Sequence, residues 1–347
     1  MDKALAALYD RKGGLGGSAP KVARWLGDIR KYFPSTVVQV MQQDAIERLN
    51  LRTLLLEPEM MESIIPDLSL ATTLISLGEA IPDESKSSAR ALVRRVVEDI
   101  ERRVADGTRA ALRGALSRSA RTNRPLTADI DWNRTIARNL KTFQPELNTI
   151  IPERLVGYRR AGRSMTKDVV LAIDQSGSMA ESIVYSAVFG AVIASMRSLR
   201  TSLVVFDTEV VDLTDLLDDP VDVLFSTQLG GGTDINRAIA YCQSLITRPA
   251  DSIFVLISDL YEGGIRDEML ARVKQLTDAG VQVVLLALSD SGAPSFDREI
   301  AADLAAMEIP AFACTPDAFP ELLALAINKG DIRGWADRAG LAERGRS

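Results

Sequence analysis

The sequence predicts an α/β protein with a Rossmann-like, doubly wound and mainly parallel sheet, preceded by a mostly α-helical N-terminal region. Two observations support this fold class. From Lys167 onward, short aliphatic runs alternate with helix-length segments, as expected when helices cover both faces of a parallel sheet. Earlier in the chain, apolar residues recur at spacings of three and four, the period of a helix. We therefore predict a helical region at 1–160, an α/β domain at 161–332 and a C-terminal tail at 333–347.

The clearest helix of the N-terminal region follows Pro82. Its apolar residues form one stripe, Ser85 is a candidate N-cap, and Gly107 is expected to end it. Arginines and acidic residues alternate four positions apart along this helix, as with Arg94 and Glu98. Such pairs predict a solvated helix face with internally paired charges.

The second half of the chain alternates between predicted strands and helices. Buried strands are predicted at 168–173, 202–206, 252–257, 281–288 and 310–314. Helices are predicted at 179–199, 234–247, 267–279, 297–307 and 317–328. The run at 209–213 follows its predecessor too closely for a crossover helix, so we predict an antiparallel edge strand there.

Composition excludes several function classes. The chain has no histidine, so it can form neither a Ser-His-Asp nor a Cys-His catalytic unit, nor a zinc site of the usual kinds. Its two cysteines, Cys242 and Cys314, are expected to be buried inert thiols in a reducing cytoplasm. The longest apolar runs are too short for a membrane span, and the N-terminus lacks the pattern of a secretory signal. Trp25, Trp132 and Trp335 are expected to anchor the core or an interface between domains.

Polar side chains with oxygen donors follow the predicted strands at one edge of the sheet, where ligands bind in such folds. They lie in three loops and comprise Asp174, Ser176 and Ser178, then Thr233 and Asp234, then Ser258, Asp259 and Glu262. Oxygen donors suit Mg²⁺, Mn²⁺ or Ca²⁺, and a few carboxylates among neutral hydroxyls favour Mg²⁺ or Mn²⁺. The alternative is that these residues only cap helices, Ser178 at one helix and Thr233 or Asp234 at the next. The ordered occurrence of all three loops favours the metal site.

This constellation resembles the metal-ion-dependent adhesion site of von Willebrand factor A (VWA) domains, whose pattern is D-x-S-x-S, a Thr and an Asp in three loops. The resemblance implies a metal held by Asp174, Ser176, Ser178, Thr233 and Asp259, with Asp234 and Glu262 as weaker candidates for supporting roles. The whole chain is also similar to bacterial VWA proteins of the CoxE-like group, notably at WLGDIRKYFP (25–34) and DIDWNRTIARNL (129–140). That similarity implies a MoxR-type AAA+ ATPase as partner.

Residues 86–141 are basic, with 14 Lys and Arg against 6 Asp and Glu. Within 107–128, five arginines have no acidic neighbour and form a possible partner-binding surface: Arg109, Arg113, Arg118, Arg121 and Arg124. These side chains could meet an acidic protein surface or phosphates. Single-strand nucleic-acid sites usually add stacking aromatics, yet no aromatic residue lies between Phe33 and Trp132. A protein partner is therefore favoured, with RNA binding as the alternative.

The expected function is that of a cytoplasmic, non-enzymatic adaptor. The glycine-rich segment at 13–18 follows no buried strand and lacks the Lys of a phosphate-binding loop, so any ATPase is expected to be a separate protein. A metal-dependent hydrolase is disfavoured, because two-metal hydrolases need more carboxylates than these loops offer. We expect the metal to grip an Asp or Glu of a partner.

Overall fold

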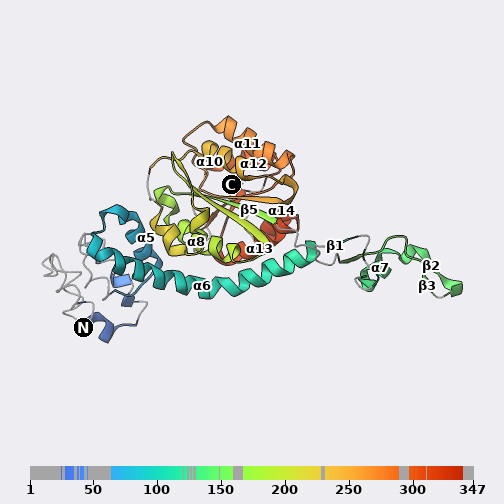
Figure 1. Cartoon of the computed structure of the whole chain (residues 1–347), viewed down its shortest axis with the longest axis horizontal. Coiled ribbons are helices and arrows are strands. Elements are labelled where there is room, and N and C mark those ends of the chain that lie inside the picture. Colours follow the sequence, from blue (N-terminus) through green and yellow to red (C-terminus); the bar gives the residue numbers. More distant parts are fainter. Residues whose placement is uncertain are drawn as a thin grey trace.

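The computed structural model describes residues 25, 28–34, 37–38, 40–42, 45, 64–119, 121–122, 125, 127, 130–147, 149–158, 167–227, 231–288, 297–309 and 311–338. Arg124 and the glycine-rich segment at 13–18 lie outside these residues. Three units are visible in Figure 1: an α/β body, a long helix beneath it, and an arm extending from the end of that helix.

The body is built on a six-stranded sheet in the order β10-β9-β8-β5-β6-β7, which confirms the predicted doubly wound fold. The strands are β5 (Lys167–Asp174), β6 (Leu199–Phe206), β7 (Val210–Asp212), β8 (Ser252–Ile257), β9 (Gln282–Leu288) and β10 (Ala311–Cys314). All neighbours are parallel except β7, which pairs with β6 in the antiparallel sense as predicted. All five predicted core strands are therefore present.

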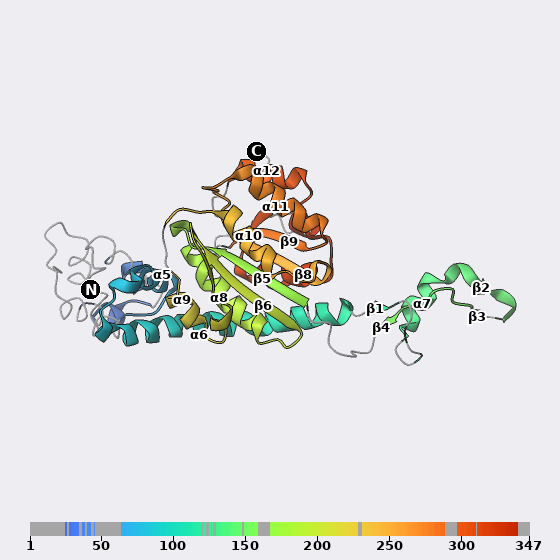
Figure 2. The same cartoon turned by 45° about the horizontal axis from the view of Figure 1, so that its top comes forward.

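Helices cover both faces of the sheet because alternate residues of each strand point to opposite sides. The helices of the body are α8 (Ala180–Ala194), α9 (Pro220–Phe225), α10 (Ile235–Leu245), α11 (Arg266–Asp278), α12 (Arg298–Ala306), α13 (Phe319–Ile327) and α14 (Ile332–Arg338). Leu171 and Ile173 of β5 belong to the same buried cluster as α8 and α13, whereas Val170 and Ala172 pack with α10, α11 and α12. Figure 2 shows the two helical layers on either side of β5.

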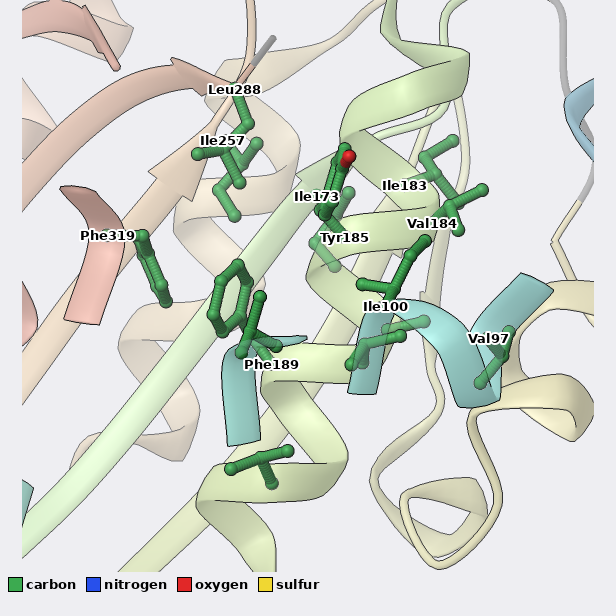
Figure 3. Close-up of a cluster of buried hydrophobic side chains, with 14 of the residues drawn as sticks. Val97, Ile100, Ile173, Ile183, Val184, Tyr185, Phe189, Ile257, Leu288 and Phe319 are labelled. Carbon is green, nitrogen blue, oxygen red and sulfur yellow. The ribbon is translucent and has the colours of Figure 1, made fainter. Parts of the chain in front are cut away.

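Helix α8 is the main helix of the first layer. Its Phe189 ring lies 4.7 Å from the Phe319 ring of α13, centroid to centroid, and both side chains are buried (Figure 3). The stretch Gly177–Ala194 is the one segment of the described residues that is long and apolar enough to cross a membrane. Because α8 packs against β5, β6 and α6 and is mostly buried, its place in the core accounts for that apolar character.

The long helix α6 (Asp83–Ser119) contains 37 residues and continues past Gly107, so the predicted helix end there is wrong. The helix continues because its buried face does: Leu112 and Ala115 beyond Gly107 are fully buried in the same cluster as α8 and α13. At its other end, α6 follows the short helix α5 (Leu68–Leu77). The N-terminal helical region thus shares a hydrophobic core with the α/β body.

The charged face of α6 is paired internally in one part, where Arg102 lies 3.0 Å from Asp99, and contacts the body in another, which was not expected. Arg94 donates to Asp219 at 2.7 Å instead of forming an ion pair with Glu98, and Asp219 caps α9. Arg90 pairs with Asp222 of α9, and its guanidinium lies 5.2 Å from the centroid of the Phe225 ring. These contacts attach the body to α6 by charge as well as by apolar packing.

The arm follows α6 and comprises β1 (Arg121–Thr122), α7 (Trp132–Arg138), β2 (Phe143–Gln144), β3 (Thr149–Ile150) and β4 (Gly157–Tyr158). β1 pairs with β4, and β2 pairs with β3, both antiparallel. Trp132, predicted to be a core or interface anchor, is 54% exposed on this arm. The same prediction is confirmed for Trp25 and Trp335, which are buried.

Candidate metal centre

The site lies where β5 and β8 end, in the middle of the sheet. The chain leaves β5 for β6 on one side, while β8 pairs with β5 on the other, so the loops that follow β5 and β8 diverge from a topological switch point. Ile173 is in register with Ile257, which sets the next residues, Asp174 and Ser258, side by side. Open parallel sheets bind their ligands at such a crevice.

Asp174 is the last residue of β5 and is fully buried. Its Oδ1 accepts a hydrogen bond from the backbone N–H of Ser176 at 2.8 Å, and its Oδ2 accepts one from the Ser258 hydroxyl at 2.8 Å. Burial raises the pKa of the Asp174 carboxyl above its ordinary value, the hydrogen bonds oppose this effect, and the charge of Asp259 raises the pKa further. The two carboxylates therefore interact electrostatically.

A chain of hydroxyls joins the first loop to the third. Ser176 Oγ and Ser178 Oγ lie 3.1 Å apart, and Ser178 Oγ donates to Asp259 Oδ2 at 2.6 Å. The Ser178 side chain makes no capping bond to α8, so the capping interpretation fails for this residue. The structure thus brings together four of the five predicted ligand residues.

The two carboxylates of the site have no neutralising cation among the described residues. Asp174 is fully buried and Asp259 is 4% exposed, yet neither forms an ion pair with a described Lys or Arg. A buried carboxylate is normally paired with a cation or coordinated to a metal. No group of three acidic, His or Cys side chains gathers in the described part of the chain, so hydroxyls, backbone carbonyls or water would complete a metal site here. Two carboxylates with hydroxyls match the donors preferred by Mg²⁺ or Mn²⁺.

Thr233 lies in the second loop, which contacts the third loop through its backbone. The Thr233 carbonyl accepts the Gly263 N–H at 2.8 Å, and a Cβ at Gly263 would lie 2.6 Å from that oxygen. The described contacts include no hydrogen bond from the Thr233 hydroxyl to Asp174, Ser176 or Asp259. The structure therefore shows a backbone contact between the Thr233 loop and the third loop, and the role of the Thr233 side chain as a ligand stays a prediction.

Asp234 and Glu262 stabilise the beginning of α10. Asp234 accepts the N–H of Arg237 at 2.8 Å, so the capping interpretation holds for this residue. Glu262 accepts from the N–H groups of Ile235 and Gly264, both at 2.8 Å. Burial raises the pKa of Glu262, and the backbone hydrogen bonds oppose this. The Glu262 side chain thus connects the third loop to the beginning of α10, which Asp234 caps.

Two residues absent from the predicted ligand set contribute to this edge. Ser258 bridges the site by donating to Asp174 and by accepting the Leu260 N–H at 3.0 Å. Its position directly after a buried strand is the signal that identifies it. Asp207, which follows β6, accepts the Asp234 N–H at 2.8 Å through its carbonyl and so joins the β6 loop to the Thr233 loop.

Other predicted functional residues lie away from this edge. Arg109 lies 3.8 Å from Glu101 and 3.6 Å from Asp106, so it does have acidic neighbours, on the preceding turns of α6. The side chains of Arg118 and Arg121 are outside the described set. Cys242 and Cys314 are fully buried, and burial raises the pKa of each thiol to about 12. They are inert thiols, as predicted.

Comparison with known proteins identifies the family to which the chain belongs. The model of the family described as "VWA domain containing CoxE-like protein" matches residues 102–323. The chain belongs to this family. It is 36% identical over 336 residues to the uncharacterised protein YehP of Escherichia coli K12, covering 93% of this chain and 89% of that protein. The predicted resemblance to the CoxE-like group is thereby confirmed.

Several solved structures of other proteins are similar to this CoxE-like chain at low sequence identity. BatB of Bacteroides thetaiotaomicron is 16% identical with a TM-score of 0.36, and the match covers 47% of this chain and 98% of that one. A von Willebrand factor type A protein of Catenulispora acidiphila is 15% identical with a TM-score of 0.36, covering 47% and 43%. The RO (RSR) protein of Deinococcus radiodurans is 14% identical with a TM-score of 0.35, covering 95% and 74%.

Proposed function

We propose that this CoxE-like VWA protein is a non-enzymatic adaptor that binds Mg²⁺ or Mn²⁺ and uses the ion to hold an acidic residue of a partner protein. The main support is the buried pair Asp174 and Asp259, which has hydroxyls around it and no cation from the described chain. The residues proposed to hold the ion are Asp174, Ser176, Ser178, Thr233 and Asp259.

The exposure of the site suits this role. Asp174 and Asp259 are buried, whereas Ser176 is half-buried and Ser178 is exposed, so the site is closed below and accessible from solvent. A bound divalent ion would supply positive charge with a coordination position open to an incoming carboxylate. The chain's own residues would then hold the ion in place and leave one side free for the partner.

Chemistry favours binding over catalysis. The chain has no histidine for acid–base chemistry, and the described site offers two carboxylates rather than the larger set that a two-metal hydrolase uses. The partner that we propose is a MoxR-type AAA+ ATPase in the cytoplasm, on the basis of the resemblance to the CoxE-like group. A client protein presented to that ATPase would be a second ligand. The alternative of RNA binding rests on the arginines of residues 107–128.

Metal binding is tested first, with purified full-length protein and Mg²⁺ or Mn²⁺ followed by calorimetry and thermal unfolding. At a metal concentration roughly 100 times the dissociation constant, wild type should gain about 2.7 kcal/mol of stability. Asp174→Asn should lose this gain, while Asp215→Asn, at an exposed carboxylate of another loop, should retain it. Equal metal binding by wild type and Asp174→Asn would overturn the assignment.

Partner binding is tested with the same variants as baits for a purified MoxR-type ATPase from the same genome. Comparing variants avoids a chelator, which would also strip Mg²⁺ from the ATPase nucleotide. Wild type and Asp215→Asn should retain the ATPase, and Asp174→Asn should not. Retention independent of Asp174 would contradict a metal-mediated contact. Nuclease-sensitive, salt-dependent retention of RNA would instead support the alternative.

A further inference from the structure

The arm has an inverted distribution of polar and apolar side chains. On α7 and the turn after it, Thr135 and Asn139 are buried, while Ile136 and Leu140 are exposed. A helix on a globular protein normally buries its apolar stripe and exposes its polar one. Figure 1 shows that the arm extends away from the body, so no part of the body covers the outer face of α7.

Hydrogen bonds to polar side chains fix the interior of the arm. Thr135 Oγ1 donates to the Val156 carbonyl at 3.1 Å and accepts the Val156 N–H at 3.0 Å. Asn139 donates to the carbonyls of Thr135 and Arg154 and accepts the N–H groups of Glu153 and Arg154. These bonds satisfy the buried polar groups and hold Thr135 and Asn139 inside the arm. The apolar side chains therefore point outward as part of the folded structure of the arm.

The exposed apolar side chains are concentrated on the arm. We call the following set the arm surface: Trp132, Ile136, Leu140, Phe143, Leu147 and Ile151, which are between 44% and 70% exposed. These six residues come from α7, from the turn after it and from the β2–β3 region. Single exposed apolar residues are normal, whereas six of them on one short segment indicate a binding surface.

Charge indicates the kind of surface that the arm would meet. Residues 121–158, which form the arm, contain 6 Lys and Arg against 4 Asp and Glu, a net charge of +2, whereas residues 167–338 of the body contain 12 against 26, a net charge of −14. On the arm itself, Arg138 and Lys141 are exposed beside the apolar residues and form no ion pair with described residues. The arm is therefore opposite in charge to the body of the same chain.

We propose that the arm surface docks on the acidic body of a second copy of this protein, so that the chain self-associates through its arms. The arm of one copy points away from its own body in both views, which leaves it free to reach another (Figures 1 and 2). An anionic membrane would repel the acidic body, whereas in a reciprocal dimer the arm of each copy would meet the acidic body of the other. This proposal is independent of the metal site.

The test measures the mass of the full-length protein by sedimentation and light scattering over a range of concentrations and salt. Wild type should form dimers or larger oligomers, and added salt should weaken them. The double variant Leu140→Ser, Leu147→Ser should raise the dissociation constant by roughly tenfold or more. Arg138→Gln with Lys141→Gln should raise it less. The matched control Val40→Ser changes a similarly exposed apolar residue of the N-terminal region, outside both the arm and the body, and should leave it unchanged.

Several results would overturn the proposal. Wild type could remain monomeric at every concentration, or its oligomers could persist in the Leu140→Ser, Leu147→Ser variant. Loss of association in Val40→Ser alone would place the contact in the N-terminal region instead. Flotation of a monomeric wild type with phosphatidylserine-containing vesicles would assign the arm surface to lipid. Circular dichroism of each variant separates loss of docking from loss of folding.

Discussion

The body and the arm differ in which side chains they bury: the body buries apolar side chains, and the arm buries polar ones. In the body, residues 168–173 of β5 are buried on both faces of the sheet, and apolar burial on each side stabilises the fold. In the arm, Thr135 and Asn139 lie inside and Ile136 and Leu140 lie outside. Hydrogen bonds specify geometry but contribute little net free energy, so the arm is expected to be much less stable than the body. Part of its apolar surface is exposed to solvent.

The largest effect on the free energy of unfolding is expected from a large-to-small substitution in the core of the body. Phe189→Ala removes a fully buried ring that packs against Phe319 and should cost about 3–5 kcal/mol in the free energy of unfolding. Urea unfolding followed by far-ultraviolet circular dichroism measures the loss. Val211→Ala, at an exposed apolar site of the body, should stay within about 0.5 kcal/mol of wild type. A small loss in Phe189→Ala would mean that apolar burial does not dominate the body.

The corresponding change in the arm should act locally. Asn139→Ala leaves the carbonyl of Arg154 and the N–H groups of Glu153 and Arg154 without their side-chain partner. We expect the free energy of local opening to fall by about 1–3 kcal/mol, seen as faster amide exchange in the arm while urea unfolding of the body is unchanged. Asn133→Ala, at an exposed position of α7, is the matched control. A global loss of stability would show that the arm and the body unfold together.

The helix that joins the two regions can be strengthened. Gly107 lies in the interior of α6, and a Cβ there would meet nothing within 4 Å. Gly107→Ala should therefore stabilise the protein by about 0.5–1 kcal/mol in the urea experiment. Gly190→Ala in α8 is the contrasting variant, because its Cβ would lie 3.0 Å from the Leu217 side chain. A neutral or harmful Gly107→Ala would indicate that α6 bends or opens at that residue.

The smallest effect is expected at the ion pair between α6 and α9. Burial alone would raise the pKa of Asp219, but the hydrogen bonds from Arg94 and the Val221 N–H outweigh it and lower the pKa. A lowered pKa adds stability above the ordinary value of 3.8, and this stability is lost as the pH falls through the folded-state value. Arg94→Gln should thus cost about 0.2–1 kcal/mol at neutral pH, because the pair is partly exposed. The difference from wild type should vanish in strong acid.

The fold of the body could be predicted because its hydrophobic patterns coincide with its burial. Aliphatic runs located β5, β6, β8, β9 and β10, and the short spacing after β6 located the edge strand β7. The end of α6 could not be predicted, since Gly107 is a helix stop only when no buried face follows it. The exposure of Trp132 also escaped prediction, because an apolar residue signals burial only if something covers it.

The positions of site residues could be predicted where they lie at the ends of strands. They could be predicted less well where they lie in longer loops. Asp174 and Asp259 follow neighbouring strands, and parallel pairing brings them to the same crevice. Thr233 comes at the end of a loop whose path is set by tertiary contacts, so its side-chain direction does not follow from the sequence. Ser258 and Asp207 have bridging roles that appear only once three loops are folded together.

The length of α6 has a consequence for how the arm is aimed. A helix of 37 residues spans about 55 Å, and each residue turns the chain by about 100° around the helix axis. The number of residues between the body and β1 therefore sets both the reach of the arm and its rotational phase. A single-residue insertion in the outer part of α6 would turn the arm surface to another side of the molecule, while the structure of the arm itself would stay unchanged. The direction in which the arm surface faces is therefore fixed by the exact number of residues in α6.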